Sequence, residues 1–295
     1  MEKAKPHSRR GDVLRLLVDH GAMSASAIIA CIEPPIQPRR FREVIARLRK
    51  YKWIHAMRTF DDTRGPLYYF ISTDARARRA VADHLEIGMD EIRPPFFRRI
   101  ELIHSDHCAL WKEFLRRRFP NALILRDHEF QYLDVGNKLL MSHREDNDVN
   151  PDMLLVFRRP EFSRPVSIAV EIERTLKGQT RLARKLKKYA CETYLDGIIY
   201  FCEAEVRQVK IRELYRDNVL TETNRVSHFG DNFALLSDSA FRGFSTEPEM
   251  FNADGKRVSL NDWVSTLLSS EEYQRDNVMF PVLAAGGCRA RLESN

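Results

Sequence analysis

Three acidic residues stand where they could hold a divalent cation together. Asp152 opens one strand-like run, and Glu171 and Glu173 close the next, which spans residues 166–172. Residues i and i+2 of a strand point to the same side, so Glu171 and Glu173 share a face while Ile172 turns toward the core. With Asp152 from a neighbouring strand, they would form an oxygen-only cluster of the kind that binds Mg²⁺ or Mn²⁺ and activates water against a phosphodiester.

Each of these motifs also has a purely structural interpretation. A Pro-Asp pair at the start of a strand often marks only a turn, and Glu-x-Glu on an edge strand is often a solvated face. Three carboxylates placed together without a cation would raise one another's pKa values, and a bound metal relieves that repulsion. The residues alone therefore leave both a metal site and a structural role open.

A second candidate site is a strongly basic helix expected from about Gln37 to Tyr51. Its apolar residues recur at i, i+3, i+4 and i+7 from Phe41, which places one side of the helix against a core. Glu43 is the only acid on the opposite side. That side and the residue just beyond the helix carry Arg39, Arg40, Arg42, Arg47, Arg49, Lys50 and Lys52.

The elements on either side of this helix indicate what its basic face could bind. Two shorter helices precede it, and two β-rich stretches, 53–60 and 67–71, follow it, joined by a turn that contains Arg64. Three helices followed by a hairpin is the winged-helix order, in which the third helix enters the major groove and the hairpin lies along the backbone. A lone basic helix would be a solvated surface, but this position predicts binding of double-stranded DNA by these cations and by Arg64.

The whole chain is expected to be α+β. A winged helix-turn-helix domain is predicted over 9–90, an αβββαβ domain over 97–270 and a C-terminal tail over 271–295. The second domain follows from a helix at 100–119, strands at 122–125, 153–157 and 166–172, a basic helix at 180–194 and a strand at 197–202. A further helix at 73–85 is either a connector or a dimerisation element, so a homodimer stays open.

The second half resembles the PD-(D/E)xK nuclease fold. The resemblance is carried by Pro151-Asp152, about eighteen intervening residues and Glu171-Ile172-Glu173 on an apolar strand. More narrowly, the winged helix followed by these motifs, and by Leu182, Lys185, Leu186 and Tyr189 on the next helix, resembles the replication-relaxation family, which includes MobC-type plasmid mobilisation proteins. The match covers roughly residues 10 to 205.

The resemblance implies an accessory role at plasmid DNA, either in replication or in a relaxosome where a separate relaxase nicks the transfer origin. In the nuclease pattern Glu171 matches a metal ligand, but Glu173 stands where a lysine is expected. Lys185 on the following helix could replace that lysine, and Glu113 could be an additional acid. The alternatives are a Mg²⁺- or Mn²⁺-dependent endonuclease, with Asp152, Glu171, Glu173 and Lys185 as catalytic residues, and a transcriptional regulator.

The charge distribution is consistent with DNA binding, and the cysteine pattern is consistent with a reducing compartment. Residues 1–120 hold 24 Lys and Arg against 15 Asp and Glu, whereas the remainder holds 24 against 27, so the basic half is the candidate polyanion surface. The five cysteines include no C-x-x-C pair, and no apolar run is long enough for a membrane span. A cytoplasmic location with no membrane partner is expected. His104 and His107 share a helix and are expected to serve in packing rather than in metal binding.

Overall fold

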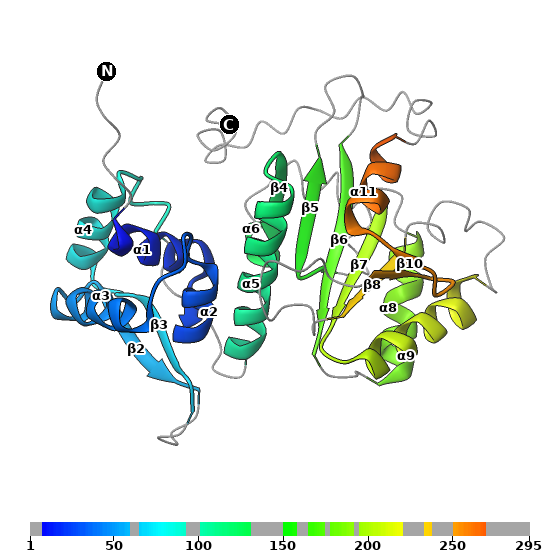
Figure 1. The fold of residues 1–295 in the computed structure, drawn as a ribbon, viewed down its shortest axis with the longest axis horizontal. Helices are drawn as coiled ribbons and strands as arrows, with labels where there is room; N and C mark the ends of the chain where they lie inside the picture. The colour runs from blue at the N-terminus through cyan, green and yellow to red at the C-terminus, as the bar shows by residue number, and fades with distance from the viewer. Residues whose placement is uncertain are drawn as a thin grey trace. The chain divides into compact units, whose positions relative to one another are not determined.

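The structure is a computed structural model that describes residues 8–59, 65–92, 101–130, 150–157, 165–174, 178–191, 195–220, 233–237 and 250–269 (Figure 1). Arg64 and the predicted tail 271–295 lie outside the described residues. Within the described part of the chain, no helix combines the length and apolar character that crossing a membrane requires.

The chain divides into two compact units, residues 1–113 and 114–295, and each mixes helices with a sheet. The predicted α+β class is therefore confirmed. The division falls inside α5 (Leu102–Arg118). The predicted domain boundaries, 9–90 and 97–270, stay predictions.

Four helices near the N-terminus surround the core of the first unit: α1 (Arg9–His20), α2 (Ala25–Cys31), α3 (Pro38–Lys50) and α4 (Ala75–Leu85). Side-chain caps fix three of their starts, since Ser8, Ser24 and Asp74 each accept a hydrogen bond from a backbone N–H of the following turn. Helix α1 ends at Gly21, whose φ of 79° suits a residue without a Cβ. Helices α3 and α4 lie where the sequence predicts them, at about 37–51 and 73–85, and α1 and α2 are the two shorter helices expected before α3.

A three-stranded antiparallel sheet completes this core. The predicted strands are present as β2 (Ile54–Arg58) and β3 (Leu67–Ile71), with Ile54 opposite Ile71 and Arg58 opposite Leu67. A third strand, β1 (Ala22–Ser24), pairs with the other edge of β3, so the order is β1-β3-β2. The sequence did not predict β1, because three residues between two helices carry no alternation of their own.

The first part of α5 also belongs to this unit. Leu102 packs with Ala22 and Tyr68. The buried Asp106 accepts a hydrogen bond of 2.9 Å from the Ser24 backbone N–H. The apolar stripe of this helix predicts the helix itself but does not reveal which core it covers.

The second unit is built on a seven-stranded mixed sheet in the order β10-β9-β8-β7-β6-β5-β4. Its strands are β4 (Ala122–Arg126), β5 (Met153–Phe157), β6 (Val166–Glu173), β7 (Gly197–Cys202), β8 (Phe233–Ser237), β9 (Met250–Asn252) and β10 (Arg257–Val258). The central strands β6 and β7 run parallel, and β4, β5 and β6 are antiparallel neighbours. Strand β6 is therefore an interior strand. The interpretation of Glu171-Ile172-Glu173 as the solvated face of an edge strand does not apply.

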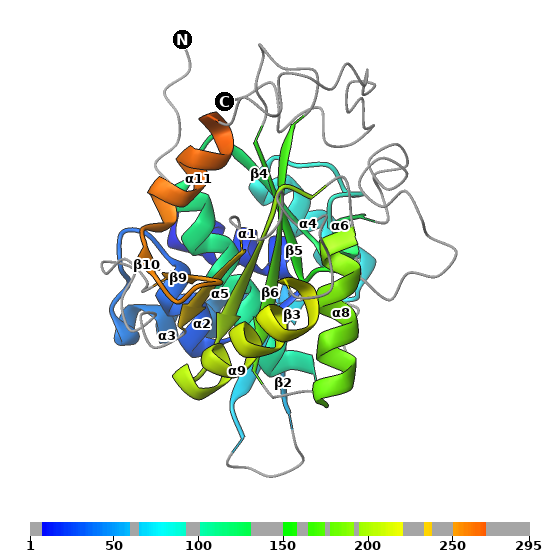
Figure 2. The same ribbon diagram turned by 90° about the vertical axis from the view of Figure 1, so that its right-hand side faces the viewer.

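Helices cover both faces of this sheet (Figure 2). Helices α8 (Gln179–Cys191) and α9 (Glu205–Tyr215), the latter continued by η3 (Arg216–Leu220), bury Leu182, Leu186 and Ile211 against one face. Helix α11 (Leu260–Ser269) lies on the other face, where a Cβ on Gly197 would stand 2.8 Å from the Trp263 ring. A short helix, α6 (Asp127–Phe130), follows β4. The predicted order αβββαβ is observed from α5 to β7, with α6 added.

Candidate functional site

The exposed side of α3 carries the predicted cations. All seven predicted cations from Arg39 to Lys52 are exposed, whereas Phe41, Val44, Ile45 and Leu48 are buried. The apolar face thus fixes the helix on the core, and the cations face solvent. The eighth predicted residue, Arg64, falls on the part of the chain that is not described.

Glu43 lies among these cations and contacts two of them. Its carboxylate oxygens are 3.5 Å from Arg39 Nε and 3.1 Å from Arg40 Nη1. Both arginines stay largely exposed, at 86% and 56% of their side chains. Exposed ion pairs of this kind stabilise a fold by less than about 1 kcal/mol, so they leave both guanidinium groups available to a ligand.

The end of α3 is shaped by backbone hydrogen bonds around Lys52. The Lys52 N–H donates to Arg49 O at 2.9 Å, and the Trp53 N–H donates to Leu48 O at 3.0 Å. Lys52 itself has a φ of 57°, the left-handed conformation that commonly closes a helix and usually falls to glycine. A lysine in this place extends the cationic face beyond the last helical turn.

The second predicted site centres on Glu171, whose side chain is 1% exposed. Lys185 Nζ on α8 lies 2.6 Å from Glu171 Oε1, and the buried Tyr189 hydroxyl donates a hydrogen bond to the same oxygen. Burial raises the pKa of Glu171 to about 7, against the opposing effect of the Lys185 charge. The Lys185 side chain is therefore turned toward Glu171, which is the orientation that it needs in order to replace the lysine of the nuclease pattern.

Asp152 lies beside this carboxylate. The register that pairs Met153 with Val170 places Asp152, one residue earlier, next to Glu171 across the β5–β6 ladder. Its Oδ2 accepts a hydrogen bond of 2.7 Å from the Ile172 N–H, which holds the side chain at the strand. The negative charge of Asp152 further raises the pKa of Glu171.

Glu173 lies on the same strand face as Glu171, two residues further along β6. It is 2% exposed at the end of β6. Among the residues that the structure describes, Asp152, Glu171 and Glu173 do not form one group of atoms close enough to ligate a single ion. The structure thus brings Asp152, Glu171 and Lys185 together without Glu173. Tyr189 completes the group, and its place one turn after Lys185 was the signal that could have added it to the predicted site.

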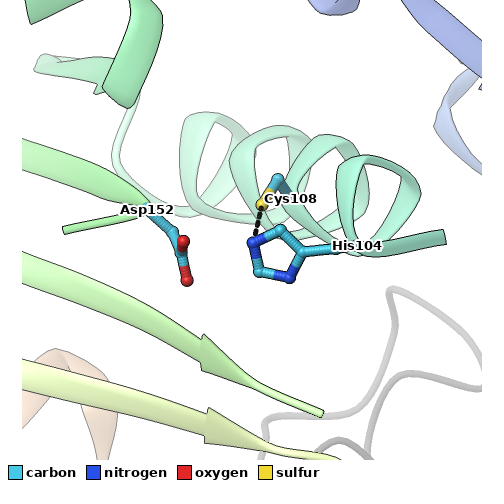
Figure 3. A group of neighbouring side chains, drawn as sticks. All are labelled: His104, Cys108 and Asp152. Carbon is cyan, nitrogen blue, oxygen red and sulfur yellow. Dashed lines mark hydrogen bonds between the residues drawn. The ribbon is translucent and has the colours of Figure 1, made fainter. Parts of the chain in front are cut away.

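The acidic and histidine residues of α5 have contacts of their own. Glu113 Oε1 lies 3.0 Å from Nε2 of the buried His20 in the first unit, and burial lowers the pKa of that histidine. His104 Nε2 lies 3.5 Å from Cys108 Sγ, one turn along the same helix (Figure 3). Figure 3 also draws Asp152, which belongs to the second unit. The contact between His104 and Cys108 is the local pairing of i and i+4 positions.

Comparison with known proteins adds no relative to this description. No family model, no curated protein and no solved structure matches the chain.

Proposed function

We propose that this chain binds double-stranded DNA through the exposed cationic face of α3. The observation that carries the proposal is the division of α3 into two faces, with every described cation on the solvent side and every large apolar residue in the core. Around it, three helices precede the β2–β3 pair, as in a winged helix, whose third helix docks in the major groove. An exposed face with seven cations and a single acid is suited to phosphate groups.

Paired substitutions in the full chain test this proposal. Arg39→Ala/Arg42→Ala and Arg47→Ala/Lys50→Ala are each expected to weaken binding of a duplex roughly tenfold, because each pair removes about two phosphate contacts. Arg76→Ala/Arg79→Ala, which removes two exposed cations from α4 in the same unit, is the matched control and should bind like the unchanged protein. Equal binding by all three variants would overturn the proposal.

The biological role that we propose is that of an accessory protein of plasmid replication or mobilisation, acting on origin DNA, with a relaxase as a partner. It rests on the resemblance of the motifs to the replication-relaxation family. Footprinting on plasmid DNA tests it, because protection at a replication or transfer origin is expected. Protection at promoters alone would instead favour a transcriptional regulator.

A metal-dependent nuclease is the second candidate, favoured by the contact of 2.6 Å between Lys185 and Glu171. Asp152 and Glu171 offer the oxygen ligands that Mg²⁺ or Mn²⁺ prefers, and a bound cation would add to Lys185 in favouring the charged form of the buried Glu171. These two residues would hold the ion, which would activate water, and Lys185 would lie beside the phosphoryl group.

Cleavage of supercoiled DNA isolates this second candidate. Mg²⁺- or Mn²⁺-dependent nicking that disappears in Asp152→Ala and in Glu171→Ala supports it. If the unchanged protein cleaves no DNA with either metal, the nuclease hypothesis is wrong and DNA binding is the only proposed function that stands.

A further inference from the structure

Helix α8 carries a stripe of cations on the second unit. Its sequence, QTRLARKLKKYAC, holds five lysines and arginines and no acid. Arg181, Arg184, Lys185 and Lys188 recur at i, i+3, i+4 and i+7, so they line one side of the helix. Arg181 and Arg184 are exposed and Lys188 is half-buried.

Two of the three cations on the neighbouring helix α9 are in ion pairs. Arg207 lies 2.9 Å from Glu203, and Lys210 lies 3.4 Å from Glu213. On α8, by contrast, neither Arg181 nor Arg184 is in ion-pair contact with an acidic group of the described chain. This contrast stands in the half of the sequence that has more acids than bases.

The length of the stripe fits a repeating anion. Seven residues of helix separate Arg181 from Lys188, which is about 10 Å at 1.5 Å per residue. Along the axis of a DNA duplex, that length spans about three phosphates of one strand, which are spaced about 3.4 Å apart in that direction. The fourth member, Lys185, turns inward to Glu171, so the outer cations border the buried carboxylate site.

We propose that Arg181, Arg184 and Lys188 form a second contact with the phosphate backbone of nucleic acid, made by the second unit and independent of base sequence. The inference extends the proposed function, because it adds a contact to the same ligand, but it does not depend on α3. An acidic protein is the alternative ligand for such a cationic surface. The regular spacing of the cations, with the large apolar residues Leu182 and Leu186 buried, favours a phosphate backbone.

The test compares full-length variants in binding a duplex of arbitrary sequence over a range of salt concentrations. Arg181→Ala/Arg184→Ala is expected to weaken binding roughly tenfold and to make the slope of log K against log salt about 2 units less negative. Arg181→Lys/Arg184→Lys keeps the charge and should bind like the unchanged protein. Arg207→Ala/Lys210→Ala, on α9, removes the same charge from paired cations and should also leave binding unchanged.

The outcomes separate this inference from the proposed function. If the α8 alanine pair binds like the unchanged protein while the α3 pairs do not, the second contact is wrong and the α3 interface stands. If the α8 pair weakens binding and the α3 pairs do not, α8 is the interface and the proposal for α3 fails. Loss of binding in the α9 control equal to that in the α8 pair would mean that overall charge, not this stripe, attracts DNA, and would overturn the inference. Thermal unfolding of each variant confirms that these exposed substitutions leave the fold intact.

Discussion

Helices α3 and α8 have the same length and the same kind of sequence, yet they present their cations to different surroundings. Each has 13 residues, an apolar face and a basic face. On α3 every described cation points to solvent, and the buried face is wholly apolar. On α8 one cation, Lys185, turns inward and contacts the buried carboxylate of Glu171.

The difference shows that the role of a basic amphipathic helix depends on the residues against which the helix packs. Helix α3 packs on apolar residues only, so all of its cations face solvent and can contact a ligand. Helix α8 packs beside the buried Glu171, so Lys185 belongs to an internal site while Arg181 and Arg184 face solvent. Sequence alone gives both helices the same pattern, so the contrast comes only from tertiary structure.

The largest expected effect is on stability, and it comes from the buried apolar face that both helices have. Leu48 and Leu186 are both 0% exposed. Leu48→Ala and Leu186→Ala should each lower the free energy of unfolding by about 3 kcal/mol, because each leaves a cavity in a packed core. Urea denaturation measures this. A loss below about 1 kcal/mol in either variant would mean that its apolar face does not hold the helix.

Replacing one cation in each helix should separate them. Lys185→Met is expected to destabilise the protein by about 2 kcal/mol, because Glu171 loses its partner in a buried site and takes up a proton instead. Arg47→Met should change stability by less than about 0.5 kcal/mol, as is usual for exposed positions. Equal effects in denaturation would contradict the distinction between an inward and an outward cation.

The Glu171 site should also have a pH dependence that the α3 surface lacks. The pKa of Glu171 is about 7 in the folded protein against an ordinary value of 4.5. Between these values the folded state holds a proton that the unfolded state has lost. The contribution is therefore full below pH 4.5, falls by up to about 1.4 kcal/mol per pH unit as pH rises, and is lost above pH 7.

Glu171→Gln should remove this fall, whereas Glu203→Gln, which alters a partly exposed glutamate, should keep it. Stability curves between pH 4.5 and 8 provide the measurement. An unchanged curve in Glu171→Gln would show that another group causes the fall.

The smallest effect is expected at the one acid of the α3 surface. Glu43→Gln removes the exposed ion pairs to Arg39 and Arg40 and should change stability by less than about 0.5 kcal/mol. DNA affinity should rise a few-fold, since a negative charge that repels phosphate is gone. Weaker binding, measured on the same duplex, would indicate that Glu43 orients the two arginines instead.

Much of the fold was predictable because local rules agree with tertiary structure. Periodicity predicted α3 and α8, and the run of apolar residues at 197–202 predicted β7. Strand β1 was missed because its three residues form a strand only by pairing with β3. Helical spacing predicted α5, but it does not say which core the first part of this helix covers.

The candidate sites were predictable to different degrees. The exposure of the α3 cations follows from helical spacing alone. The contact of Lys185 with Glu171 was only conditional in the sequence, since it depends on how α8 crosses the end of β6. The separate position of Glu173 was not foreseen, because alternation along a strand fixes the face of a side chain but not its distance from groups on other strands.

The salt dependence of DNA binding by the unchanged full-length protein tests the central claim most directly. Six contacts between α3 and phosphates would give a slope of log K against log salt of about −5, and contacts from α8 would make it more negative. A slope of this size, reduced in the α3 variants, is the expected result. No binding, or binding that does not change with salt, would contradict the claim that the cationic face of α3 binds DNA.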